Sequence, residues 1–128
     1  MIQSVPTVIY PVVQQFFTEY AAIYSKDWRL LFEGVKRLHP EYCAAAKAVA
    51  GGHYYLANNV FIMKTDWFRR MCRFAFDILL FVDDDYRGAG LCRGDRYAGY
   101  LFEYLYSVFV FRHAKEMRIA YDEMTYLT

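Results

Sequence analysis

The spacing of apolar side chains predicts helices along most of the chain. In residues 12–24, 26–38 and 66–82, apolar residues recur every three or four positions, which is the repeat of one helix face. The segment 96–114 is apolar nearly all round, which is typical of a buried helix. A fifth helix of small residues is predicted over 41–50, between a proline and two glycines. The pattern therefore predicts about five helices.

Shorter apolar segments between these helices favour strands. Residues 7–10 and 54–64 are rich in aromatic and β-branched side chains and are too short for helices. We interpret 117–124 as a last strand or an extended tail. Short strands between helices are typical of an α/β sheet, here one whose other strands are missing. The sequence thus predicts a helix-rich α/β fold, a single domain over residues 1–128 that forms the later part of a larger fold.

The amino-acid composition of the chain limits the kinds of partner and cellular setting that we expect. The chain is 57% hydrophobic and its 15 Lys and Arg nearly balance 14 Asp and Glu, which argues against disorder and against duplex DNA as a partner. The first residues do not form a signal peptide, and no apolar run reaches the roughly 20 residues of a membrane span. Three cysteines without metal-ligand spacing fit a reducing cytoplasm.

Two patterns resemble metal sites in part. The run Asp83-Asp84-Asp85 lacks a carboxylate at the twelfth position of a calcium loop, where Gly94 stands. It also follows a helix, whereas a metal-binding DxD pair follows a strand, so we interpret it as a solvated helix end. Among the histidines, only the loose pair of His113 with Glu116 has helical ligand spacing. We therefore predict no metal site within the chain.

Polar groups inside apolar segments are the stronger candidates for a site. Asn58 and Asn59 lie within a core-bound run, and a buried amide without a partner costs about 1–3 kcal/mol. Glu103 lies in the most apolar helix, where an unpaired charge would be costly. Arg96 precedes it by two helical turns, so both could reach one small pocket. A structural ion pair with a neighbouring element explains the last two residues equally well.

Four segments resemble a family of bacterial capsular and exopolysaccharide glycosyltransferases that was formerly described only as a domain of unknown function. The segments are HPEY (39–42), NNVFIMKTDWF (58–68), FAFDILLFV (74–82) and RYAGYLFEYL (96–105). The similarity covers nearly all of this chain but only the C-terminal half of the family. It implies the C-terminal portion of a GT-A-like, nucleotide-sugar-binding fold.

The resemblance also implies a reaction and its site. A sugar would pass from a nucleoside diphosphate sugar to a growing capsular or exopolysaccharide acceptor. Asn58, Asn59, Lys64 and Arg96 would bind substrate, and Glu103 would orient Arg96 or act as a base. A divalent cation, Mn²⁺ or Mg²⁺, would be held by residues outside this chain.

The expected setting is the cytoplasm or the inner face of the membrane, with peripheral membrane association. A second copy of the chain or a missing N-terminal half would be the protein partner. The alternative is a non-catalytic, helix-rich module that binds a glycan or another protein through its aromatic side chains.

Overall fold

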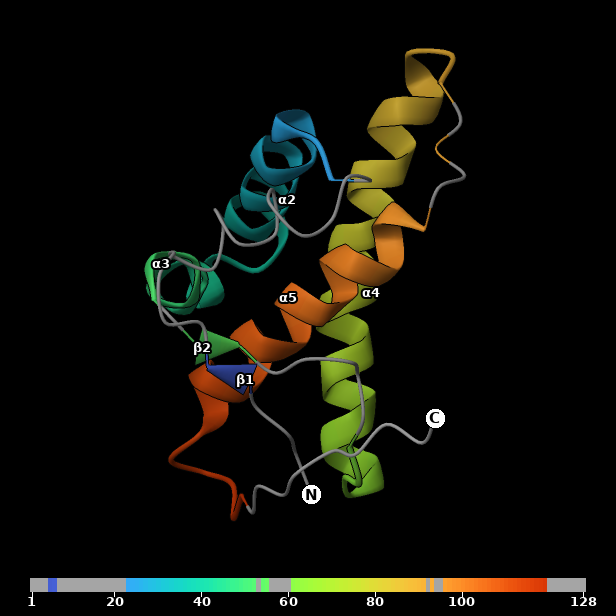
Figure 1. The fold of residues 1–128 in the computed structure, drawn as a ribbon. Coiled ribbons are helices and arrows are strands. Elements are labelled where there is room, and N and C mark those ends of the chain that lie inside the picture. The colour runs from blue at the N-terminus through green and yellow to red at the C-terminus, as the bar shows by residue number, and fades with distance from the viewer. Residues whose placement is uncertain are drawn as a thin grey trace, which may run out of the picture.

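The computed structural model describes residues 5–6, 23–52, 54–55, 61–91, 93 and 96–119. Its elements, in chain order, are β1 (Val5–Pro6), α2 (Ser25–Leu38), the 3₁₀ helix η1 (Pro40–Tyr42), α3 (Cys43–Gly51), β2 (Tyr54–Tyr55), α4 (Thr65–Gly88) and α5 (Tyr97–His113). Figure 1 shows α5 crossing between α4 on one side and α2 with α3 on the other. The described part of the chain is a helical assembly.

The predicted α/β class is wrong. In the residues that the structure describes, the strands are β1 and β2, two residues each, with Val5 opposite Tyr55 in antiparallel register, and Phe61 adds a single bridge. That pairing is too short to form a GT-A-like sheet. Of the strand predicted over 54–64, Tyr54–Tyr55 form β2, residues 56–60 lie outside the described residues, and α4 begins at Thr65. The predicted elements at 7–10, 12–22 and 120–124 lie outside the described residues.

Aromatic packing against helices explains why the strand prediction failed. The Phe61 ring stacks on Tyr106 of α5, with ring centroids 5.0 Å apart, and also lies near Phe68 of α4. A run of aromatic and branched residues suits a half-buried surface of any kind, so β-propensity alone could not separate a strand from a segment laid against helices.

The helices predicted over 26–38, 41–50, 66–82 and 96–114 form, and α2 and α4 bury most of their apolar side chains. Trp28, Leu31 and Val35 of α2 are buried, as is the stripe of α4 comprising Met71, Ala75, Ile78 and Val82. The predicted burial of α5 is confirmed, because residues 103–110 are buried without a break. Tyr104 of α5 packs edge-on to Trp28, and its hydroxyl donates to the carbonyl of Ala46 at 2.5 Å.

Close contact between α2 and α4 depends on a glycine. A Cβ added at Gly34 would lie 2.9 Å from Cδ1 of Phe81 and 3.4 Å from Cγ2 of Ile78. The two helices therefore approach more closely than a larger residue at position 34 allows. This packing fixes the start of α2 beside the end of α4.

The helix α4 continues past the predicted end. The acidic run from Asp83 to Asp85 was interpreted as a break, but the helix includes it and ends at Gly88. Carboxylates near a helix C-terminus are unfavourable beside its partial negative charge. Here Arg87 pairs with Asp83 at 2.7 Å and Lys26 with Asp85 at 3.6 Å, which offsets that repulsion. Within the described ranges, no helix combines the length and apolar character needed to cross a membrane.

Candidate functional site

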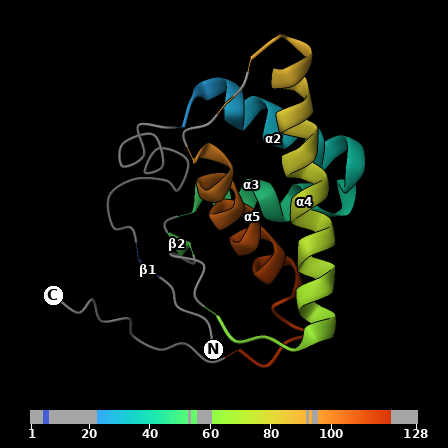
Figure 2. The ribbon, with the colours of Figure 1, turned by 90° about the vertical axis from the view of Figure 1, so that its right-hand side faces the viewer.

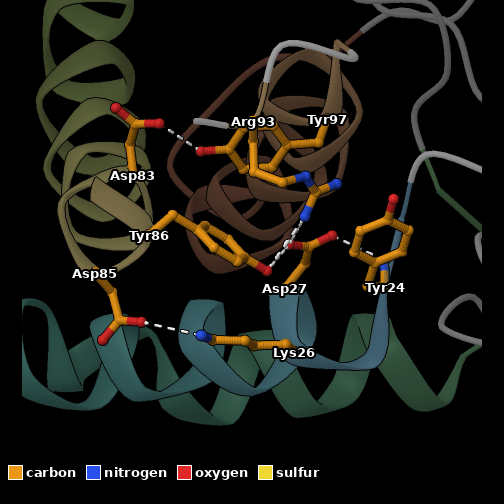
Figure 3. Close-up of polar contacts among 8 residues, drawn as sticks. All are labelled: Tyr24, Lys26, Asp27, Asp83, Asp85, Tyr86, Arg93 and Tyr97. Carbon is orange, nitrogen blue, oxygen red and sulfur yellow. Dashed lines mark hydrogen bonds and ion pairs between the residues drawn. The ribbon is translucent and has the colours of Figure 1, made fainter. Parts of the chain in front are cut away.

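A buried ion pair joins the start of α2 to the segment between α4 and α5. Nη1 of Arg93 lies 2.6 Å from Oδ1 of Asp27. The Asp27 side chain is 0% exposed and that of Arg93 is 9% exposed. Figure 3 shows the Arg93 side chain pointing toward the Asp27 carboxylate at the start of α2. A carboxylate and a guanidinium removed from water this fully hold each other in place, because either one alone would be costly to bury.

Further donors complete the coordination of the Asp27 carboxylate. The Tyr86 hydroxyl of α4 donates to Oδ1, and the backbone N–H of Tyr24 donates to Oδ2 at 2.7 Å. The bond from Tyr24 is the capping interaction expected of an acidic residue in the first turn of a helix. One side chain thus caps α2 and ties it to α4.

Three tyrosine rings surround the Arg93 guanidinium. Its central carbon lies 4.1 Å from the ring centroid of Tyr24, 4.4 Å from that of Tyr97 and 5.1 Å from that of Tyr86. Aromatic faces attract a cation, and the attraction grows when water is excluded. Arg93 also donates to the Tyr86 hydroxyl at 3.2 Å. We call Asp27, Arg93 and these three tyrosines the Asp27–Arg93 cluster.

Two phenols of this cluster, Tyr86 and Tyr97, have a raised pKa and so hold their protons more firmly than a free phenol. Burial, and then the hydrogen bond to Asp27, raises the pKa of Tyr86 to about 12. Burial, and then the hydrogen bond that its hydroxyl donates to Asp83 at 2.7 Å, raises the pKa of Tyr97. A phenol that resists ionisation is a hydrogen-bond donor and a poor nucleophile. The cluster therefore positions the segment that leads into α5 and supplies no reactive group of its own.

A second polar group lies at the opposite end of α5. Nε2 of His113, which is buried, lies 2.7 Å from the Tyr42 hydroxyl, and its Nδ1 lies 2.5 Å from Oε2 of Glu116. Since a carboxylate only accepts, Nδ1 carries a proton and donates to Glu116, and Nε2 forms the hydrogen bond with the Tyr42 hydroxyl. The hydrogen bond from His113 lowers the pKa of Glu116, and burial raises the pKa of Tyr42. The loose pair seen in the sequence is thus a real contact.

The predicted site residues differ in their surroundings. Glu103 is 4% exposed on α5, and the Ser107 hydroxyl donates to its backbone carbonyl at 3.1 Å. Arg96 is exposed and is the N-cap residue of α5, with a left-handed φ of 66°. Lys64 is exposed and is the N-cap residue of α4. Asn58 and Asn59 lie outside the described residues.

The left-handed backbone at Arg96 alters the geometry predicted for it. The argument that two helical turns place Arg96 and Glu103 on one side assumed that both residues are helical. Because Arg96 precedes the helix, its side chain direction does not follow the helical repeat. Arg96, which is exposed, and Glu103, which is buried, are still separated by about two helical turns of chain.

Sequence reasoning missed the Asp27–Arg93 cluster. Neither Asp27 nor Arg93 was among the candidate residues that the sequence indicated. The two residues are 66 positions apart, so no local spacing relates them. The available signal was the large number of tyrosines, 13 of 128 residues.

In the described part of the chain, neither a metal site nor a cavity supports the predicted site residues. No group of three or more His, Cys, Asp or Glu side chains there could hold a metal ion. An open hollow of about 540 Å³ lies against α2 and is lined by Phe32, Glu33, Lys36 and Arg37, none of which was predicted as a site residue.

Comparisons with known proteins give one match. A family model described as a domain of unknown function (DUF4422) matches residues 4–115. A search of the curated proteins and a search of the solved structures each found no match.

Proposed function

The chain belongs to the DUF4422 family, and we propose that it is the helical part of a glycosyltransferase that serves cell-surface polysaccharide synthesis. Its substrate would be a nucleoside diphosphate sugar, and its product a capsular or exopolysaccharide chain lengthened by one sugar. A nucleotide-binding part and a divalent cation, Mn²⁺ or Mg²⁺, would come from residues outside this chain. We place the reaction in the cytoplasm, at the inner face of the membrane.

The observation that carries the proposal is the start of α5. An exposed guanidinium at Arg96 stands at the N-terminus of a 17-residue helix, where unpaired backbone N–H groups and the helix dipole favour an anion. Arginine binds phosphate oxygens through two parallel hydrogen bonds. The neighbouring Asp27–Arg93 cluster fixes the segment that carries Arg96. A diphosphate is the ligand that best suits this arrangement.

The resemblance segments support the proposal because they touch one another. Nε2 of His39 in the first segment lies 2.8 Å from Oδ2 of Asp77 in the third segment. The Tyr42 ring stacks on Phe74, again between the first and third segments, at a centroid distance of 4.0 Å. Residues that carry a shared family pattern are thus parts of one packed body, as a common scaffold requires.

The remaining roles follow the same proposal. Asn58, Asn59 and Lys64 would contact the sugar or its phosphates. Glu103, buried on the helix that Arg96 begins, would orient a polar ligand group or accept a proton from the acceptor hydroxyl.

Calorimetric titration of the chain with a panel of nucleoside diphosphate sugars tests the proposal. We expect saturable binding to at least one, weakened at least about tenfold by Arg96→Ala because a charge-assisted phosphate contact is lost. Asn59→Ala should weaken binding while leaving the melting temperature nearly unchanged. The matched control is Arg118→Ala, which removes another exposed arginine. Absence of binding to every nucleotide sugar, or equal loss in Arg118→Ala, would contradict the proposal.

A non-catalytic module that binds a glycan or another protein is the second candidate. Among the residues that the structure describes, eight large hydrophobic side chains are exposed, including Ile62 at 77% and Leu80 at 60%. Exposed apolar groups of this size mark interaction surfaces when they are contiguous. Binding of an oligosaccharide without its nucleotide, together with silence towards every nucleotide sugar, would favour this candidate.

A further inference from the structure

The outward face of α4 carries two large apolar side chains at the middle of the helix. Phe76 is 51% exposed and Leu80 is 60% exposed. Residues four positions apart are neighbours on a helix surface, so the two form one patch. Figure 2 is seen from the side on which α4 lies, and the other helices are behind it. The Phe76 ring also lies 6.1 Å from that of Phe102, which extends the patch onto α5.

Two unpaired charges flank this patch. Arg73 precedes Phe76 by three residues, and Asp84 follows Leu80 by four. Both are exposed, and within the described ranges no ion pair or side-chain hydrogen bond joins either to another residue. An exposed helix usually pairs such charges with neighbours on its own surface.

Each of the other charged residues of α4 has an ion pair or, in the case of Arg70, a cation–π contact. Asp66 pairs with Arg69, Arg70 lies over the Trp67 ring, Asp77 pairs with His39, Asp83 with Arg87, and Asp85 with Lys26. Arg73 and Asp84 are thus the charges that α4 leaves available to a partner, a cation before the patch and an anion after it.

We propose that a second copy of this chain docks on the patch, with its α4 antiparallel to the first. Arg73 and Asp84 are eleven residues apart, or about 16 Å along the axis. A two-fold axis through their midpoint sets each Arg73 opposite Asp84 of the other copy, twice over. With the same axis, Phe76 of one copy and Leu80 of the other differ in position along the helix axis by about 1.5 Å.

The order of the charges along α4 favours a second copy of the chain in the antiparallel orientation. Parallel helices would set Arg73 against Arg73, and an anionic membrane surface would repel Asp84. Arg69 and Arg87 of opposite copies would also come near each other, but Asp66 and Asp83 already neutralise them. The apolar patch supplies the contact area, and the two ion pairs set the register.

Sedimentation equilibrium over a range of protein concentrations tests the proposal. We expect a monomer–dimer equilibrium that weakens as salt rises, because exposed ion pairs are screened. Arg73→Glu alone and Asp84→Arg alone should each raise the dimer dissociation constant at least about tenfold, since each sets like charges opposite one another twice. Leu80→Glu should abolish the dimer. Lys115→Glu, a reversal at an exposed position outside α4, is the control and should leave the constant within about twofold.

The double variant Arg73→Glu/Asp84→Arg decides the register. It restores both ion pairs only in the antiparallel arrangement, so its dissociation constant should return to within about threefold of the parent value. Circular dichroism melting of each variant checks that the exposed substitutions leave the fold intact. A chain that stays monomeric at every concentration overturns the proposal, including the case in which a nucleotide-binding part covers the patch instead. A dimer that survives Leu80→Glu, or one that the double variant does not restore, overturns it as well.

Discussion

Replacing Arg93 with methionine should strongly destabilise the chain, because it leaves the Asp27 carboxylate buried without its cation. Methionine keeps most of the length and apolar character of the arginine stem. Asp27 is 0% exposed and would retain only the Tyr86 hydroxyl and the Tyr24 N–H as donors. The three tyrosine rings that now surround the guanidinium would lose their cation–π contacts as well.

The expected loss is about 3–5 kcal/mol, the usual cost of removing one partner of a buried ion pair. A chain of 128 residues has an unfolding entropy near 0.27 kcal/mol per kelvin at its midpoint. The melting temperature should therefore fall by about 10–20 °C. Such a loss is a large part of the about 5–15 kcal/mol that stabilises a typical domain.

Urea unfolding of Arg93→Met beside Arg87→Met separates burial from charge. Arg87 also pairs with an aspartate at 2.7 Å, but its side chain is 72% exposed, so its loss should cost at most about 1 kcal/mol. In the double variant Asp27→Asn/Arg93→Met, the loss should be smaller than the sum of the single losses by at least about 1 kcal/mol. Equal losses for Arg93→Met and Arg87→Met would refute the reasoning that the cluster is a buried, coupled unit.

Three further changes should each affect stability in a defined way. Gly34→Ala should destabilise by about 1–3 kcal/mol in urea unfolding, because its Cβ would overlap the Phe81 ring at 2.9 Å. Raising the pH from about 10 towards 12 should reduce stability, because Tyr86 keeps its proton in the folded chain up to about 12 and loses it near 10 when unfolded; the difference in absorbance at 295 nm between the chain and a Tyr86→Phe variant, which reports the tyrosinate of Tyr86, should rise together with unfolding. His113→Ala should cost about 2–4 kcal/mol in thermal unfolding, since it empties a buried volume and removes the partner of the Tyr42 hydroxyl.

Each of these outcomes has a counterpart that would contradict it. Gly99→Ala is the control for Gly34, because nothing lies within 4 Å of its added Cβ, and it should be neutral or slightly stabilising. Equal effects at the two glycines would contradict the close approach of α2 and α4. An absorbance difference from Tyr86→Phe that already appears at pH 10 in the folded chain would contradict the burial of Tyr86. An unchanged melting temperature in His113→Ala would contradict its contact with Tyr42.

The positions of the described helices could be predicted from the sequence. The C-terminal end of α4 and the small extent of the sheet could not. Apolar spacing identified the buried stripes of α2 and α4, since one helix face must meet the core whatever the rest of the chain does. The end of α4 was missed because the charges of Asp83 and Asp85 are compensated by partners, one of which, Lys26, lies on another helix. The α/β prediction failed because pairing in the described residues is limited to short strands, and Phe61, an aromatic residue of the predicted strand, packs on α5.

For the candidate site, the burial of Glu103 could be predicted from the sequence, but the ion pair between Asp27 and Arg93 could not. Glu103 was expected inside the most apolar helix and is 4% exposed there. The partnership of Asp27 with Arg93 spans 66 residues and arises only when α2 and α4 pack together. Arg96 was assumed to be helical, and no local pattern shows that a left-handed residue begins α5. Pairing across the fold depends on tertiary geometry, which a single sequence does not display.

Nuclear magnetic resonance titration of the ¹⁵N-labelled chain with nucleoside diphosphate sugars tests the central claim most directly, namely that the start of α5 binds a sugar diphosphate. The account predicts saturable shifts of the backbone amides of Tyr97, Ala98 and Gly99, next to Arg96, and their loss in Arg96→Ala. Shifts that avoid the start of α5, or that persist unchanged in Arg96→Ala, would contradict it.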